Sequence, residues 1–118
     1  MVTTTPGYWC ECRTASAFIA FIDAPTADHA VRWIAIALHT ILPALDPDAS
    51  AHTWRWLQQD RHTMTEDLQQ GQPGTLTIAT LTTRITWTAH PALFLPLAHR
   101  HNIQLPPCAG AFRATATP

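Results

Sequence analysis

Cys10 and Cys12 are the residues whose type and spacing most directly suggest chemistry, and they lie in the stretch YWCEC, residues 8–12. Side chains at alternate positions of a strand point to the same face, so the two thiols could bind one metal ion. A structural zinc ion takes about four ligands in a tetrahedral array. Cys108 and a single histidine could complete such a set. Zinc binding through Cys10, Cys12 and Cys108 is therefore one interpretation of the sequence.

The neighbouring histidines His99 and His101 do not complete this set as a pair. We expect residues 97–101 to form the last turn of a helix, where side chains two positions apart diverge by roughly 200°. The cysteines also lack the Cys-x-x-Cys spacing of a redox pair at the start of a helix. Free cysteines are commonly buried as small hydrophobic residues. We predict this role for the thiols and keep zinc binding as the alternative.

The histidines and glycines form no catalytic motif. The seven histidines are scattered, without an HExxH pattern or a local partner pattern. The sequence contains no Gly-x-Ser-x-Gly nucleophile turn, and its four glycines form no loop that could hold a phosphate. We therefore predict that the protein is not an enzyme and has neither a catalytic residue nor a cofactor.

The charge balance disfavours nucleic acid as a partner. All seven basic side chains are arginines, and the formal net charge is −1. A protein that binds phosphates needs a basic face, which this composition makes hard to build. A weak nucleic-acid binder remains a second alternative, and its candidate residues are Arg55, Arg61, Arg84 and Arg100.

No segment of the sequence predicts a membrane span or a signal peptide. The longest apolar stretch, residues 30–38, contains Arg32 and is too short to cross a bilayer. The first residues carry no basic region followed by an apolar run. Three cysteines, an odd number, fit a reducing compartment better than a disulfide framework. We expect a cytoplasmic protein.

Residues 27–42 show the clearest periodicity and predict a helix with Thr26 as its N-cap. At 100° per residue, the apolar side chains fill an arc of roughly 200°, which is wider than a surface helix needs. Arg32 and His39 line up on the opposite side, and Ile36 lies alone among polar positions. We therefore expect the helix to contact a partner or a second subunit, with Arg32, Ile36 and His39 as candidate interface residues.

A second helical region is predicted to begin near Asp46 or Ser50 and to end before Gly71, a typical C′ residue. Trp54 falls in the apolar stripe of this region and is expected in the core. Trp56 falls on the polar side, among aspartates that would repel phosphates. Because a large exposed aromatic side chain is a typical interface anchor, Trp56 is the fourth candidate interface residue.

The remaining elements are predicted from alternation and turn residues. Residues 8–23 have the pattern of one extended segment, covered on both faces in its apolar second half. Residues 75–89 change phase, which predicts two short strands joined around residues 82–83. Residues 90–102 predict a short helix, and residues 103–116 a possible edge strand.

The whole chain of 118 residues, 47% hydrophobic and 13% charged, suits a single globular domain. We expect this domain over residues 8–113, between flexible ends at residues 1–7 and 114–118. The element order predicts an α+β fold, similar to a ferredoxin-like sheet of three or four mostly antiparallel strands with an added helix. The sequence thus predicts a small non-enzymatic module for protein interaction or regulation, which self-associates as a homodimer.

Overall fold

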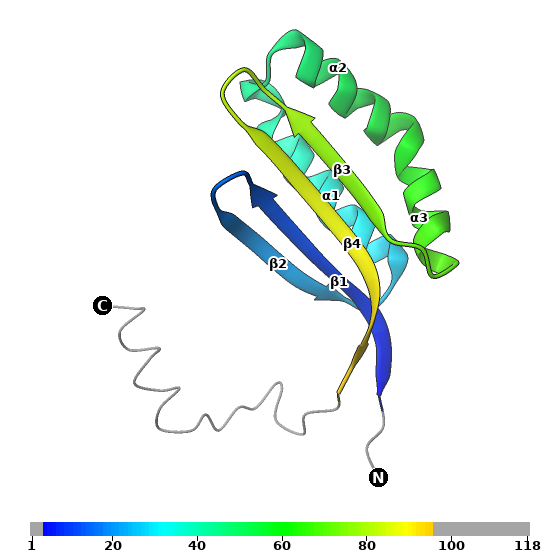
Figure 1. Ribbon diagram of the computed structural model, residues 1–118. Coiled ribbons are helices and arrows are strands. Elements are labelled where there is room, and N and C mark those ends of the chain that lie inside the picture. Colours follow the sequence, from blue (N-terminus) through cyan, green and yellow to red (C-terminus); the bar gives the residue numbers. More distant parts are fainter. Residues whose placement is uncertain (1–3, 96–118) are drawn as a thin grey trace, which may run out of the picture.

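The computed structural model describes residues 4–95, whose strands and helices form two layers (Figure 1). The strands are β1 (Thr5–Thr14), β2 (Phe18–Ala24), β3 (Gly74–Ala79) and β4 (Arg84–Phe94). The helices are α1 (Ala27–Ile41), the short 3₁₀ helix η1 (Leu42–Ala44), α2 (Pro47–Arg55), the π-helical turn η2 (Trp56–Asp60) and α3 (Arg61–Gln69). The predicted α+β class is confirmed.

The sheet consists of two hairpins joined through their long strands. Its strand order is β2-β1-β4-β3, and all neighbouring strands are antiparallel. β1 pairs with β4 along its whole length, from Thr5 opposite Phe94 to Thr14 opposite Ile85. β2 and β3 are therefore the two edge strands, and the helices connect one hairpin to the other.

Threonine side chains stabilise both hairpin turns, where glycine or asparagine is more usual. Oγ1 of Thr14 accepts a hydrogen bond from the backbone N–H of Ala17 at 3.1 Å. Oγ1 of Thr80 accepts one from the backbone N–H of Thr83 at 3.0 Å, with the same spacing. The strand break predicted around residues 82–83 is thus confirmed. The prediction of one extended segment over residues 8–23 is wrong, because it overlooks the turn after Thr14.

Local capping signals set the helix boundaries. Oγ1 of Thr26 accepts the backbone N–H of His29 at 3.1 Å, and Oδ1 of Asp46 accepts that of Ala49 at 2.9 Å. Gly71 has φ +85°, a left-handed conformation that glycine adopts without steric cost. Its N–H bonds to the carbonyl of Leu68, as in a Schellman cap. The predicted starts at Thr26 and Asp46 and the stop at Gly71 are confirmed.

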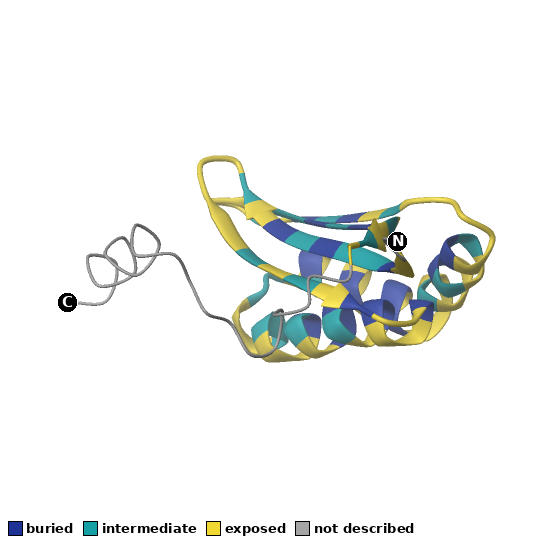
Figure 2. Cartoon of the chain, turned by 90° about the horizontal axis from the view of Figure 1, so that it is seen from below, coloured by how far each residue is buried: buried dark blue, intermediate teal, exposed yellow. Residues whose placement is uncertain are grey.

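All helices lie on one side of the sheet, and the buried residues lie between the two layers (Figure 2). Alternate residues of each strand face the helices, because successive strand side chains point to opposite faces. The largest fully buried side chains include Trp87 and Ile78 from the sheet and Ile34, Leu38 and Leu68 from the helices. The hydrophobic core is therefore one-sided.

The ferredoxin-like comparison is not confirmed. That fold alternates strands and helices as β-α-β-β-α-β, whereas here one hairpin precedes the helices and one follows them.

The helix predicted from residue 90 is wrong over residues 90–94, because pairing with β1 keeps this segment in β4. Residues 5–7 are also paired, with residues 92–94, and do not form a flexible end.

Parts of the other predictions lie outside the described residues. These are the end of the predicted helix at 96–102, the possible strand at 103–116, and the terminal segments 1–3 and 114–118. The described residues 4–95 form one continuous sheet with its helices.

Trp54 and Trp56 exchange the roles predicted for them, because the second helical region contains the π turn η2. Trp56 is 3% exposed, whereas Trp54 is 45% exposed. A π turn accommodates one additional residue, which rotates the flanking α-helices relative to each other by roughly the 100° that one residue occupies. This rotation aligns Trp56 with the buried Met64 and Leu68. The prediction of an exposed Trp56 and a buried Trp54 is therefore wrong.

Candidate functional site

The sheet face opposite the helices is covered by no element within residues 4–95 (Figure 2). We call it the bare face. Strand alternation places Trp9, Glu11 and Arg13 of β1 on it, and the register sets Trp9 between Asp23 of β2 and His90 of β4. The bare face is therefore available as a binding surface.

An aromatic cluster occupies the β1–β2 half of the bare face. The rings of Trp9 and Phe21 stack with centroids 4.8 Å apart, and the edge of Phe18 meets Phe21 at 5.6 Å. The guanidinium of Arg13 lies 4.6 Å from the centroid of the Phe18 ring, a cation–π contact. Phe18 and Phe21 are nevertheless 43% and 55% exposed. We call these four side chains the aromatic cluster.

Glu11 fixes the positions of two members of the aromatic cluster. Its Oε1 accepts the indole N–H of Trp9 at 2.9 Å, and its Oε2 accepts Nε of Arg13 at 3.1 Å. The hydrogen bond from Trp9, followed by that from Arg13, lowers the pKa of the Glu11 carboxyl. The carboxylate thus orients one aromatic ring and one cation side by side.

Threonines occupy most of the β3–β4 half of the bare face. Thr75, Thr77, Thr86 and Thr88 have the phase of this face. The hydroxyl oxygens of Thr77 and Thr86 lie 3.1 Å apart, within hydrogen-bonding distance, across the two strands. The two halves therefore differ, because one carries the aromatic cluster and the other mainly threonine hydroxyls, with Arg84 at its end.

Cys10 and Cys12 lie on the opposite face, against the helices, and are 0% and 7% exposed. Both are free thiols. Burial raises the pKa of Cys10 to about 11 and also raises the pKa of Cys12. Because the thiolate is the reactive and metal-binding form, both side chains are protonated near neutral pH and act as small hydrophobic core residues.

The zinc alternative stays a prediction. Within residues 4–95, no group of three or more histidine, cysteine, aspartate or glutamate side chains is placed to hold a metal ion. Cys108, His99 and His101 lie outside the described residues.

The four predicted interface residues lie in two places. Arg32, Ile36 and His39 are exposed on the outer surface of α1, where the ring of His39 meets that of Trp54 at 5.9 Å. Trp56 is buried at the start of η2. The structure therefore brings three of the four together and separates the fourth from them.

The wide apolar arc of α1 is largely covered within the chain. Ala30, Ile34 and Leu38 are fully buried, and Trp33 and Ala37 pack against the same core with partial exposure. Ile36, which lies outside this arc among polar positions, is 56% exposed. The apolar residues of the arc pack against the sheet and the second helical region of the same chain. The arc therefore gives no support for a contact with a second subunit.

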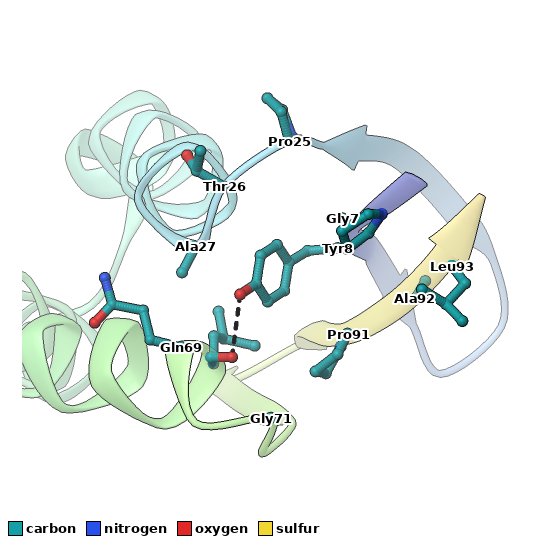
Figure 3. A pocket seen from close by; sticks show the side chains of 12 residues that line it. Gly7, Tyr8, Pro25, Thr26, Ala27, Gln69, Gly71, Pro91, Ala92 and Leu93 are labelled. Atoms are coloured by element: carbon teal, nitrogen blue, oxygen red, sulfur yellow. Dashed lines mark hydrogen bonds between the residues drawn. The ribbon is translucent and has the colours of Figure 1, made fainter. Parts of the chain in front are cut away.

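A hollow of about 600 Å³ opens at the end of the sheet where α1 begins (Figure 3). Tyr8 points into it, and its hydroxyl donates a hydrogen bond to the carbonyl oxygen of Leu68 at 3.2 Å. Its other lining residues are Pro6, Gly7, Pro25, Thr26, Ala27, Gln69, Gly71, Pro91, Ala92 and Leu93. This lining holds no carboxylate, imidazole, thiol or amine that could act as an acid, base or nucleophile.

The arginines proposed for nucleic acid do not form one surface. Arg55 ends α2 and Arg61 begins α3, on the helix side, whereas Arg84 begins β4 in the phase of the bare face. Arg100 lies outside the described residues. No helix in the described part of the chain is long and apolar enough to cross a membrane.

Comparison with protein-family models, with curated proteins and with solved structures finds no match to this chain. The fold and its surfaces are therefore the basis for a functional assignment.

The aromatic cluster was not predicted from the sequence, although a signal for it exists. The run AFIAFI, residues 17–22, fits a strand buried on both faces as well as an edge strand with one exposed face. Recognition of Thr14 as a turn residue would have paired this run with residues 8–13. The alternation of Trp9, Glu11 and Arg13 would then have marked the opposite face.

Proposed function

We propose that the protein is a small protein-interaction module that self-associates through its bare face, two copies packing sheet against sheet. The observation that carries the proposal is the aromatic cluster, whose phenylalanines remain about half exposed although they pack against each other. Contiguous exposed apolar side chains of this kind typically mark a protein interaction site. Two antiparallel sheets pack face to face in β-sandwiches in the same manner.

The charges on the bare face favour a second copy. Arg13 and Arg84 lie at the end of the face near the hairpin turns, and Asp23 lies beside Trp9, nearer the other end. Most homodimers have a two-fold axis, so the same patch meets itself. An axis that crosses the strands sets the arginine end of one face over the Asp23 end of the other. Opposite charges then meet at both rims of the interface.

The same balance argues against single-stranded nucleic acid, which also stacks on aromatic side chains beside arginine. Glu11 lies within the aromatic cluster and occupies the Nε atom of Arg13. With Asp23 on the same face, two carboxylates oppose two guanidiniums. A phosphate backbone needs a net positive surface.

The test compares two exposed side chains on opposite sides of the molecule. Phe21 on the bare face and Ile36 on α1 are 55% and 56% exposed. Sedimentation velocity over a wide range of concentration measures dimerisation of the wild type, Phe21→Thr and Ile36→Thr. We expect a wild-type dimer whose dissociation constant rises about tenfold or more in Phe21→Thr and stays unchanged in Ile36→Thr.

Three results would overturn the proposal. A wild-type chain that is monomeric at every concentration would exclude self-association. A loss of dimer in Ile36→Thr alone would place the contact on α1, with Arg32 and His39. Binding of a labelled oligonucleotide that weakens steeply with salt, and is lost in Phe21→Thr, would assign the bare face to nucleic acid.

A cytoplasmic location is part of this proposal. Its support is that Cys10 and Cys12, both free thiols in the core, fit a compartment that keeps cysteines reduced.

A further inference from the structure

The edge strand β3 presents unpaired backbone groups. The hydrogen bond from the N–H of Thr80 to the carbonyl of Thr83, 2.7 Å long, closes the hairpin. In an antiparallel pair of strands, residue pairs that are hydrogen-bonded to each other alternate with pairs that are not. Counting from the Thr80–Thr83 pair, the residues of β3 that bond to β4 are Gly74, Leu76 and Ile78. Thr75, Thr77 and Ala79 therefore direct their N–H and C=O groups away from the sheet. No hydrogen bond within residues 4–95 ends on these groups.

Nothing in the sequence of β3 protects this edge. Natural edge strands avoid pairing with other chains through charged residues, proline or bulges. The segment GTLTIA, residues 74–79, contains no charge and no proline, and its register with β4 is regular. The other edge differs, because the pairing of β2 shifts between Cys12 and Arg13. β3 is thus the edge that is ready to accept another strand.

A groove of about 360 Å³ runs beside this edge, a volume typical of ligand sites. Residues 73–77 form one wall of the groove, and the second helical region forms the other, with His52, Trp56, Asp60, Thr63, Met64 and Asp67. Figure 1 shows α2 and α3 running alongside β3. Gly74 lets the walls meet at one end, since a Cβ there would lie 2.7 Å from Cγ of Met64.

The charges in the groove are those of two carboxylates. Asp60 and Asp67 belong to the helical wall, and the lining contains no arginine. The backbone of Asp67 is held in the C-terminal cap of α3, where its carbonyl oxygen accepts the N–H of Gln72 at 2.8 Å. A peptide in this groove therefore meets negative charge on the helix side and threonine on the other.

We propose that the groove between β3 and the second helical region binds an extended segment of a partner protein, with basic side chains at alternate positions, as a fifth strand of the sheet. Backbone hydrogen bonds to Thr75, Thr77 and Ala79 supply affinity, as in other cases of strand addition. Alternate side chains of an added strand face the helices, where lysine or arginine meets Asp60 and Asp67. This site borders the bare face at Thr75 and Thr77, lies on the opposite half of the sheet from the aromatic cluster, and does not depend on self-association.

The test uses labelled peptides and the full chain. A fluorescein-labelled peptide of alternating lysine and valine is titrated with protein, and its anisotropy gives the dissociation constant. Two matched peptides replace lysine by glutamate, or carry N-methyl groups on the edge that would face β3. We expect the lysine peptide to bind, the glutamate peptide not to bind, and N-methylation to weaken binding about tenfold or more, because it removes backbone donors.

Variants of the protein separate the backbone contacts from the charges. Thr77→Pro removes an outward N–H but no bond to β4, since proline is tolerated at such edge positions. Thr77→Val is its control, because both variants lose the hydroxyl contact with Thr86. We expect Thr77→Pro to lose peptide binding about tenfold or more and Thr77→Val to retain it. The double variant Asp60→Asn, Asp67→Asn should weaken binding about fivefold, and less so at high salt.

The outcomes distinguish this site from the bare face. Phe21→Thr should leave peptide binding unchanged. Equal binding of the lysine and glutamate peptides, or equal binding by Thr77→Pro and Thr77→Val, would overturn the inference. A loss of self-association in Thr77→Pro but not in Thr77→Val would show that β3 pairs with a second copy, and would also overturn the inference.

Discussion

The two faces of one sheet differ in how their aromatic residues are used. Trp87 on the covered face is 2% exposed and anchors the core under the helices. Trp9, on the neighbouring strand but on the bare face, stacks on Phe21 and donates a hydrogen bond to Glu11. The same residue type thus supplies stability on one side and a prepared contact surface on the other. The layer of helices decides which role each residue has.

The largest expected difference between the faces is in stability. Trp87→Ala should lower the free energy of unfolding by about 3–5 kcal/mol, because it leaves a cavity in the core. Trp9→Ala should cost about 1 kcal/mol or less, the contribution of an exposed cross-strand pair. Urea denaturation followed by circular dichroism measures both. Equal losses would show that the bare face is also buried in the folded state.

Trp87→Phe gives a second measurement if Trp87→Ala does not fold. The indole N–H of Trp87 is buried and has no hydrogen-bond partner among the described residues. Phenylalanine removes this unpaired donor, so only the loss of side-chain volume lowers the free energy of unfolding of the variant. We expect a smaller loss than in Trp87→Ala.

The covered face should also respond to alkaline pH. Burial raises the pKa of Cys10 in the folded chain from its ordinary value of 9.0 to about 11. The unfolded chain therefore releases this proton first, and stability falls as pH rises from about 9 to about 11, by at most about 1.4 kcal/mol per pH unit. Cys10→Ala should flatten this slope in urea denaturation at several pH values. An unchanged slope would mean that the thiol is not buried in solution.

The smallest expected effect concerns the bare face at acid pH. Hydrogen bonds from Trp9 and Arg13 lower the pKa of Glu11 in the folded chain. The stability that the Glu11 carboxylate contributes is therefore fully present above its pKa in the unfolded chain, and it is lost as pH falls through its pKa in the folded chain. Glu11→Gln should remove this small acid dependence and leave the alkaline one unchanged. Thermal unfolding of both proteins between neutral and acid pH provides the comparison. A larger acid dependence in Glu11→Gln than in the wild type would contradict this role.

Short-range signals predicted much of the fold. Thr26, Asp46 and Gly71 marked helix ends correctly, because a cap depends on residues within one turn. The phase change in residues 75–89 indicated the second hairpin. The turn after Thr14 was overlooked because threonine replaces the glycine or asparagine that usually marks such turns.

The amino-acid sequence by itself determined the α+β class and the start of α1, because these depend on local caps and periodicity. Only the tertiary structure decided which sheet face is bare, that Trp56 rather than Trp54 is buried, and that β3 lies beside an acidic groove. An apolar strand pattern is the same whether one or two layers cover it. A single π turn changes the direction of every side chain beyond it. Both outcomes depend on contacts between segments far apart in the chain.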